Sequence, residues 1–144
     1  MKKATFLICT IVLSALLFSA CKKSNDVTIT TLQRIQAKWA VDKEYYHDNY
    51  SGVDFRDTTY GVVGDYADYR TDGKVYYKIG SYLDTASYAL LGDTKIITTY
   101  SSPGSSSYSD TATILVLTDN QFQLYVKEFD TAPDYYEYTD YLTK

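Results

Sequence analysis

Hydrophobic and polar positions divide this chain of 144 residues into three parts. Residues 6–18 are almost continuously apolar, residues 22–29 are mostly polar, and after residue 39 apolar and polar positions alternate in short runs. Such alternation is typical of half-buried β-strands, and Gly or Asp interrupts it about every eight to twelve residues. The pattern predicts a leader, a tether and a domain of antiparallel strands joined by short turns.

A short helical segment precedes the strands. Thr30 and Gln33 have the spacing of a capping box, in which each residue satisfies a backbone N–H of the other. Leu32, Ile35 and Trp39 follow at i, i+3 and i+7, on one helical face. We expect about two helical turns here, with these apolar side chains buried against the strands.

Two hairpins predict which side chains point inward. The two-residue loop 119–120 would pair Leu117 with Phe122 and Leu115 with Leu124, and the alternate positions of the second strand are polar. These four apolar side chains are therefore predicted to share the inner face.

The second hairpin, at residues 71–73, admits two registers. A two-residue loop would turn Arg70 inward, whereas a three-residue loop with Gly73 in a bulge turns Tyr69 and Tyr77 inward. We predict the bulge, because it leaves the charged side chains in water.

A third hairpin has Gly92 and Asp93 in a type II′ turn between residues 87–91 and 94–100. Further strands are expected near residues 38–49, 53–60 and 135–143. The fold class predicted is all-β: an antiparallel up-and-down barrel of eight or nine strands with a short N-terminal helix, because closure removes unpaired edges. A two-sheet sandwich is the alternative.

The first 20 residues have the form of an export signal. Two lysines precede the apolar stretch 6–18, which is shorter than a membrane-spanning helix, and two small residues stand before Cys21. Cys9 lies within the signal, so Cys21 would be the sole cysteine of the mature chain and no disulfide is expected.

Residues 17–21, Leu-Phe-Ser-Ala-Cys, resemble the lipobox of bacterial lipoproteins, with Phe18 where Leu is usual. The resemblance implies cleavage after residue 20 and acylation of Cys21, such as by palmitate, and two or three acyl chains hold a protein durably on a membrane. Lys22 is not the Asp that retains enteric lipoproteins at the inner membrane, so the resemblance favours the outer membrane. The resulting domains are a signal peptide (1–20), a lipidated tether (21–29) and a β domain (30–144).

Charge and residue inventory exclude several functions. Without Lys2 and Lys3 the 14 basic residues become 12, against 18 acidic ones, and a net charge of −6 argues against nucleic acid. One histidine and one mature cysteine leave no triad, thiol chemistry or His-rich metal site, so we expect no enzyme, cofactor or metal. His47 is predicted to be a surface residue. Two groups of acids are predicted to lie on a solvated face: Asp65, Asp68 and Asp72, and Asp134, Glu137 and Asp140.

Several segments together resemble the lipocalin-like lipoproteins of Gram-negative bacteria, over residues 32–144. They are Ala37-Lys38-Trp39, where lipocalins have Gly-x-Trp, Thr71-Asp72-Gly73, residues 90–93 and 117–122, and the closing strand 138–144. The resemblance implies a calycin-type barrel of eight strands.

Two functions follow from such a barrel. The first is binding of a small apolar or amphipathic ligand inside it, with candidate residues Trp39, Tyr69, Tyr77, Leu115, Leu117, Phe122 and Leu124. If these side chains fill the interior, the second is a surface module for a protein or glycan, with candidates Tyr135, Tyr136 and Tyr138 among the 17 tyrosines. An interior cavity of about 300 Å³ or more favours the first function and a solid core the second.

The loops suggest which end of the barrel is open. A simple meander would gather loops 49–52, 72–73, 92–93 and 119–120 at one end, and the longer loops 61–64, 80–84, 101–107 and 130–134 at the other. Longer loops usually carry binding. The chain enters its first strand at the long-loop end, however, so we expect the helix to plug that end.

Overall fold

The computed structural model describes residues 29–101, 106–129 and 133–144. The predicted signal peptide, Cys21, nearly all of the predicted tether and most of the serine-rich loop 101–107 lie outside the described residues. Within the described part, no helix is both long enough and apolar enough to cross a membrane.

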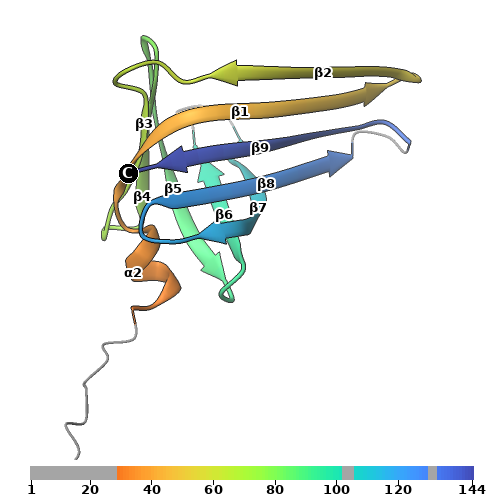
Figure 1. Cartoon of the computed structure of the whole chain (residues 1–144). Helices are drawn as coiled ribbons and strands as arrows, with labels where there is room; N and C mark the ends of the chain where they lie inside the picture. Colours follow the sequence, from red (N-terminus) through yellow and green to blue (C-terminus); the bar gives the residue numbers. More distant parts are fainter. Residues whose placement is uncertain (1–28, 102–105, 130–132) are drawn as a thin grey trace, which may run out of the picture.

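The described chain forms a short helix and nine strands (Figure 1). The helix is α2 (Thr31–Ile35), and the strands are β1 (Lys38–Tyr50), β2 (Val53–Tyr60), β3 (Tyr66–Tyr69), β4 (Lys74–Ile79), β5 (Tyr82–Leu91), β6 (Lys95–Tyr100), β7 (Tyr108–Leu117), β8 (Gln121–Phe129) and β9 (Tyr135–Thr143). All strands belong to one antiparallel sheet, and β9 pairs back onto β1. Eight strands close an up-and-down barrel and β2 is an extra strand outside it. The predicted barrel is confirmed, and the sandwich alternative is wrong.

β1 contacts three other strands. Along one edge its first residues pair with β3 and its later residues with β2, while β9 lies along the other edge. β2 and β3 therefore run in the same direction, one after the other along the same edge of β1, and residues 61–65 connect them. The far parts of β1, β8 and β9, together with β2, continue beyond the other strands as a projecting sheet (Figure 1).

α2 lies at the end of the barrel that carries the short turns. Arg34 Nη1 donates a hydrogen bond to the Leu117 carbonyl oxygen at 3.5 Å, and Arg34 Nε lies 3.4 Å from Asp119 Oδ1, at the β7–β8 turn. Turns 71–73 and 92–94 lie at this same end, because β3, β5 and β7 all run toward it. We call it the closed end.

The prediction that the helix plugs the long-loop end is wrong. That prediction assumed that β2 is a barrel strand, which would make β3 run parallel to β1. Because β3 pairs with β1 directly, β3 is antiparallel to it, and each later strand runs opposite to the direction assumed. The loops after β4, β6 and β8 therefore lie opposite α2, at what we call the open end. The two longest connections among strands β3 to β9, which follow β6 and β8, therefore join strands at the end opposite the helix, whereas the connection after β4 has only two residues.

The closed end is filled by a core around Trp39. Trp39 is fully buried, its indole N–H donates to the Ile35 carbonyl oxygen at 2.9 Å, and its ring centroid lies 5.3 Å from that of Phe122. The capping box of Thr30 and Gln33 is present, and it starts a helix of five residues, shorter than the two turns expected. Leu32, which was expected to be buried, is 41% exposed.

The predicted strand register is found in the hairpin at residues 71–73, is found only next to the turn in the hairpin at residues 119–120, and is wrong in the Gly92 hairpin. Tyr69 pairs with Val75 across the predicted three-residue turn, where Gly73 has a φ of 77°. Leu117 pairs with Phe122 as predicted. Leu91 pairs with Lys95, so the Gly92 turn has three residues and not two.

The predicted inward position of Leu115 is wrong. The register of β7 against β8 shifts between Ile114 and Val116, so Leu115 lies in a bulge and has no partner opposite Leu124. Ile114 pairs with Leu124 in its place, and Leu115 is 52% exposed. The two-residue turn next to it does not reveal this bulge, because the turn determines only the first pairs of the hairpin.

A candidate ligand cavity in the open half of the barrel

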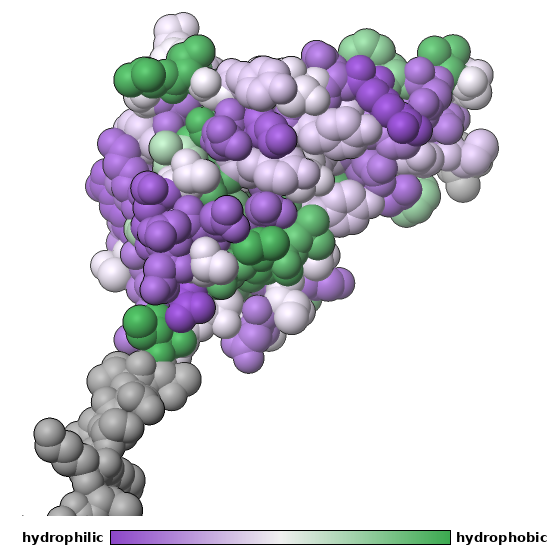
Figure 2. Space-filling view, viewed as in Figure 1, coloured by the Kyte–Doolittle hydropathy of each residue, from purple (hydrophilic) through white to green (hydrophobic). Residues whose placement is uncertain are grey.

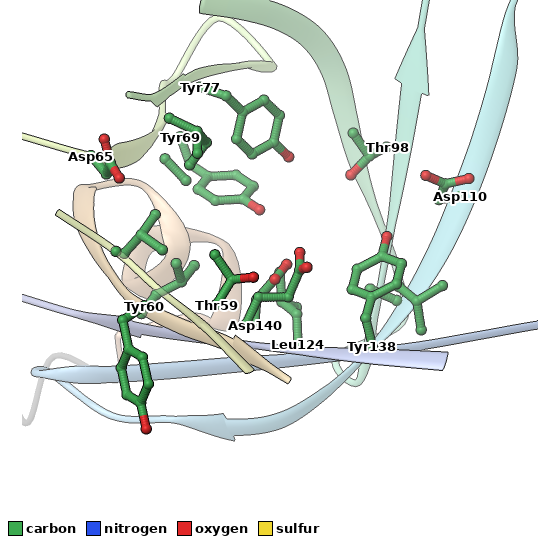
Figure 3. Close-up of a pocket in the computed structure, with 18 of the residues that line it drawn as sticks. Thr59, Tyr60, Asp65, Tyr69, Tyr77, Thr98, Asp110, Leu124, Tyr138 and Asp140 are labelled. Carbon is green, nitrogen blue, oxygen red and sulfur yellow. The ribbon is translucent and has the colours of Figure 1, made fainter. Parts of the chain in front are cut away.

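A cavity of about 290 Å³ lies inside the barrel, between the closed-end core and the open end (Figure 3). Side chains of β1, β3, β4, β6, β7, β8 and β9 line it, together with the end of β2 and the loop that follows. Tyr60 and Ile79, both exposed, stand at its margin. The barrel is therefore not solid, which contradicts the premise of the surface-module alternative.

The seven predicted ligand residues separate into three groups. Tyr69, Tyr77 and Leu124 line the cavity. Trp39 and Phe122 belong to the closed-end core, and Leu117 packs against that core. Leu115 lies outside the barrel, as described above. The alternation pattern thus identified most of the inward-facing residues correctly. It does not show which of them fill the closed-end core and which line the cavity.

Four tyrosines bring their rings and hydroxyls to the cavity from four strands. Tyr69, Tyr77, Tyr100 and Tyr138 all line it, and the rings of Tyr77 and Tyr100 stack with centroids 6.3 Å apart. Burial is the largest cause that raises the pKa of each phenol above its ordinary value, and the neighbouring phenols of Tyr69, Tyr77 and Tyr100 influence one another's pKa. The phenols therefore stay protonated at neutral pH and can both donate and accept hydrogen bonds.

Carboxyl groups face the same space. Glu44 on β1 lies opposite Asp140 on β9 in the strand register, and both line the cavity with Asp110 of β7. Burial, and then repulsion by and hydrogen bonding to Glu44, raise the pKa of Asp140 to about 7. Burial and the neighbouring Glu128 raise the pKa of Asp110 to about 6. Each pair of carboxyl groups therefore holds a proton more tightly than an isolated acid would.

The sequence contains a signal for these carboxyl groups that the prediction did not use. Tyr138, Asp140 and Leu142 alternate along β9, so they share the face that Leu142 turns to the core. An acidic residue between two inward apolar positions is unusual in a strand and marks a candidate site. The predicted positions of Tyr138 on an interaction surface and of Asp140 on a solvated face are therefore wrong.

No protein-family model and no curated protein matches this chain. Conclusions about function therefore rest on the cavity and the side chains that line it.

Asp65 holds the margin of the cavity in place. Its carboxylate accepts hydrogen bonds from the backbone N–H of Val62 at 3.0 Å and of Gly80 at 2.7 Å, and these bonds lower its pKa. Asp65 is 4% exposed, so its predicted position on a solvated face is wrong. The side chain ties the loop after β2 to the β4–β5 turn. Asp72, by contrast, caps its own turn by accepting from Lys74 N–H at 3.0 Å.

His47 lies on the opposite, outer face of the projecting sheet. Its Nδ1 is 2.8 Å from Glu137 Oε1 and its Nε2 is 2.5 Å from Asp54 Oδ1. Tyr125 Oη donates to Glu137 at 2.6 Å, and Lys127 Nζ does so at 3.2 Å. The side chain of His47 is 9% exposed, so its predicted position as a surface residue is wrong. The imidazole of His47 on β1 therefore links Asp54 on β2 to Glu137 on β9.

Titration of His47 is expected to show a pKa above 6.5. Hydrogen bonding to Asp54, and then to Glu137, raises this pKa because both carboxylates favour the imidazolium. A raised folded-state pKa means that protonated His47 stabilises the fold fully below the unfolded value of about 6.5. That contribution disappears as the pH rises through the folded value. NMR of the ring protons measures the midpoint directly, because the chain has one histidine.

Asp54→Asn tests the cause of this shift. It should lower the His47 midpoint, whereas Asp57→Asn, on the same strand but turned to the other face, should leave it unchanged. A midpoint at or below 6.5 in the unmodified chain would contradict the assignment.

The three predicted surface tyrosines do not form one patch. Tyr135 packs edge-on against His47, whereas Tyr136 is on the other face and donates to Glu128 at 2.5 Å, and Tyr138 lines the cavity. The green hydrophobic patches on the face shown in Figure 2, which are separated by purple hydrophilic atoms, come from other residues, because tyrosine is pale on this hydropathy scale. The tyrosines therefore give little support to the predicted interaction surface.

Proposed function

We propose that this protein is a lipid-anchored, lipocalin-like protein of the cell envelope whose barrel binds a small amphipathic molecule. The 290 Å³ cavity carries the binding part of the proposal, since ligand sites in proteins are typically cavities of about this size or larger, with mostly apolar walls and a few polar groups. Its lining has this character, because tyrosine rings and aliphatic side chains surround a small set of carboxyl and hydroxyl groups.

The distribution of the polar groups favours an amphipathic ligand over a purely apolar one. A hydrocarbon would leave Asp140, Glu44 and the tyrosine hydroxyls without partners in a desolvated interior, which is unfavourable. A molecule with one polar end and one apolar part satisfies both kinds of wall. The proposed role is binding and not catalysis.

Native mass spectrometry of the protein purified from its own host tests ligand binding. We expect the unmodified protein to carry a small-molecule adduct, and Ala112→Phe to lose it, because Ala112 lines the cavity and a phenyl ring there occupies the space. Thr111→Phe is the matched control, since Thr111 is exposed and adjacent strand residues point to opposite faces. Absence of any adduct in the unmodified protein, or equal adducts in both variants, would count against the proposal.

The anchor proposal rests on the sequence of the first 21 residues. Cys21→Ser should move the protein from the membrane fraction into the soluble fraction, because serine cannot accept the thioether-linked lipid. Fractionation followed by immunoblotting measures the shift, and Ser24→Ala in the tether serves as a control that should remain membrane-bound. A Cys21→Ser protein that stays with the membrane would show that the lipobox interpretation is wrong.

A further inference from the structure

Three of the four acids that line the cavity, Glu44, Asp110 and Asp140, form no ion pair in the described part of the chain. The fourth acid, Asp65, accepts hydrogen bonds from two backbone N–H groups, and its pKa is lowered further by the charge of Lys78. The lining itself contains no Lys, Arg or His. In Figure 3 the carboxyl oxygens of Asp140 point into the cavity, between Tyr69 and Tyr138.

The Asp140 carboxyl belongs to the cavity and not to an acidic outer surface. The residue is half-buried, lines the cavity, and loses enough hydration there for its pKa to rise. The charged group that acts on its pKa is Glu44, a like charge, and no cation offsets that repulsion. A cation that entered the cavity would relieve both the repulsion and the loss of hydration.

The same acids are not arranged for a metal ion. No group of three or more His, Cys, Asp or Glu side chains among the described residues lies close enough together to hold one. Calcium would require six to eight oxygen ligands, and magnesium near-octahedral coordination. Much of the cavity wall consists of tyrosine rings, which do not provide the oxygen ligands that such an ion needs.

Those rings suit an organic cation. Tyr69, Tyr77, Tyr100 and Tyr138 surround the same space as Asp140 and Glu44. Aromatic faces attract ammonium groups through their quadrupole, most strongly where water is excluded, and they also bury attached carbon atoms. Phenol hydroxyls can accept hydrogen bonds from those N–H groups of an ammonium ion that do not bond to the carboxylates.

We propose that the ligand of this barrel is an organic ammonium ion, whose charged nitrogen lies between Asp140 and Glu44 and whose carbon skeleton lies against the cavity tyrosines. The proposal rests on the binding function proposed above and names the chemical class of its ligand. Anionic amphiphiles such as fatty acids are then disfavoured, because the carboxyl groups of the cavity would repel them.

Isothermal titration calorimetry with three probes of equal chain length tests the class of ligand. The purified chain is titrated at pH 8, above the pKa of about 7 of Asp140, with n-hexylamine, which is protonated there, with hexanol and with hexanoate. We expect hexylammonium to bind at least about tenfold more tightly than hexanol, and hexanoate more weakly than either. Equal affinity for the three probes, or a preference for hexanoate, would overturn the proposal.

Asp140→Asn tests the assigned residue. Asparagine has nearly the same shape and removes only the charge, so the ratio of hexylammonium to hexanol affinity should fall to about threefold or less. Asp93→Asn changes the net charge equally in an exposed turn outside the cavity, and should leave the ratio unchanged. An unchanged ratio in Asp140→Asn would contradict the role of this carboxyl group.

The outcomes also separate this inference from the proposed function. If hexanol binds, Ala112→Phe prevents its binding, and hexylammonium shows no advantage, then the cavity is a ligand site but the ammonium inference is wrong. If none of the three probes binds, and the protein from its host carries no adduct, both proposals are wrong.

Discussion

Gly61→Ala is expected to lower the free energy of unfolding by about 3 kcal/mol or more, because a methyl group at this position has no room. A Cβ atom on Gly61 would overlap the carbonyl oxygen of Val41 and lie 2.8 Å from its carbonyl carbon. These are backbone atoms of β1, so a side-chain rotation cannot relieve the overlap. Gly61 N–H also donates to the Asp42 carbonyl oxygen at 2.9 Å, which holds the two backbones together.

The site of this overlap is where the chain leaves the projecting sheet and enters the barrel. β1 has an irregularity between Val41 and Lys43 in its pairing with β9, and Gly61 packs against that point directly after β2. Gly61 also lines the cavity. A displaced backbone here is therefore expected to alter the cavity margin as well as the stability.

Urea denaturation followed by the fluorescence of the one tryptophan measures the effect. Gly52→Ala is the control: a Cβ there meets nothing within 4 Å, but the φ of 76° should still cost about 1 kcal/mol or slightly more. Comparable losses in the two variants would show that Gly61 is not sterically required.

The sequence predicted the barrel because its main signals are local. Alternation of apolar and polar residues, and turn residues such as Gly73, act over a few positions and determined most strands, and the register next to two turns, correctly. The departure of β2 from the barrel is not a local property. It depends on β1 being long enough to pair with β3 and β2 in succession, so the sequence left the ends of the barrel wrongly assigned.

The candidate site was predicted only in part, for a related reason. Tyr69 and Tyr77 were found because they belong to one hairpin whose inward face was readable. Glu44 and Asp140 are 96 positions apart (140 less 44) and meet only when β9 closes on β1. The alternation of Tyr138, Asp140 and Leu142 marks Asp140 as an inward residue, but no local pattern shows that Glu44 faces it.

The barrel divides stability and the proposed binding between its two halves. Large apolar side chains fill the closed half, where Trp39, Phe122 and Ile35 are all fully buried. Polar and aromatic side chains surround an empty space in the open half, where uncompensated carboxyl groups contribute no stability. The closed-end core must therefore contribute more to the stability of the fold than the open half does.

Trp39→Ala should accordingly destabilise the domain severely, by about 3–5 kcal/mol, which is a large share of the about 5–15 kcal/mol typical of native proteins. The indole is fully buried and contacts Phe122, and Lys144 Nζ lies 4.1 Å from its ring centroid. Alanine would leave a void that the closed barrel cannot collapse to fill. Trp39→Phe should cost less, about 1–3 kcal/mol, chiefly by leaving the Ile35 carbonyl oxygen without its indole donor.

Circular dichroism during urea denaturation measures all variants, because Trp39→Ala removes the fluorescent reporter. Tyr82→Ala is the matched control, since this aromatic strand residue is 62% exposed and its loss should cost less than about 1 kcal/mol. Trp39 does not line the cavity, so Trp39→Phe protein that remains folded should retain its ratio of hexylammonium to hexanol affinity. A loss of that ratio would mean that the closed-end core and the cavity are coupled, and a Trp39→Ala effect no larger than that of Tyr82→Ala would mean that the fold does not depend on this core.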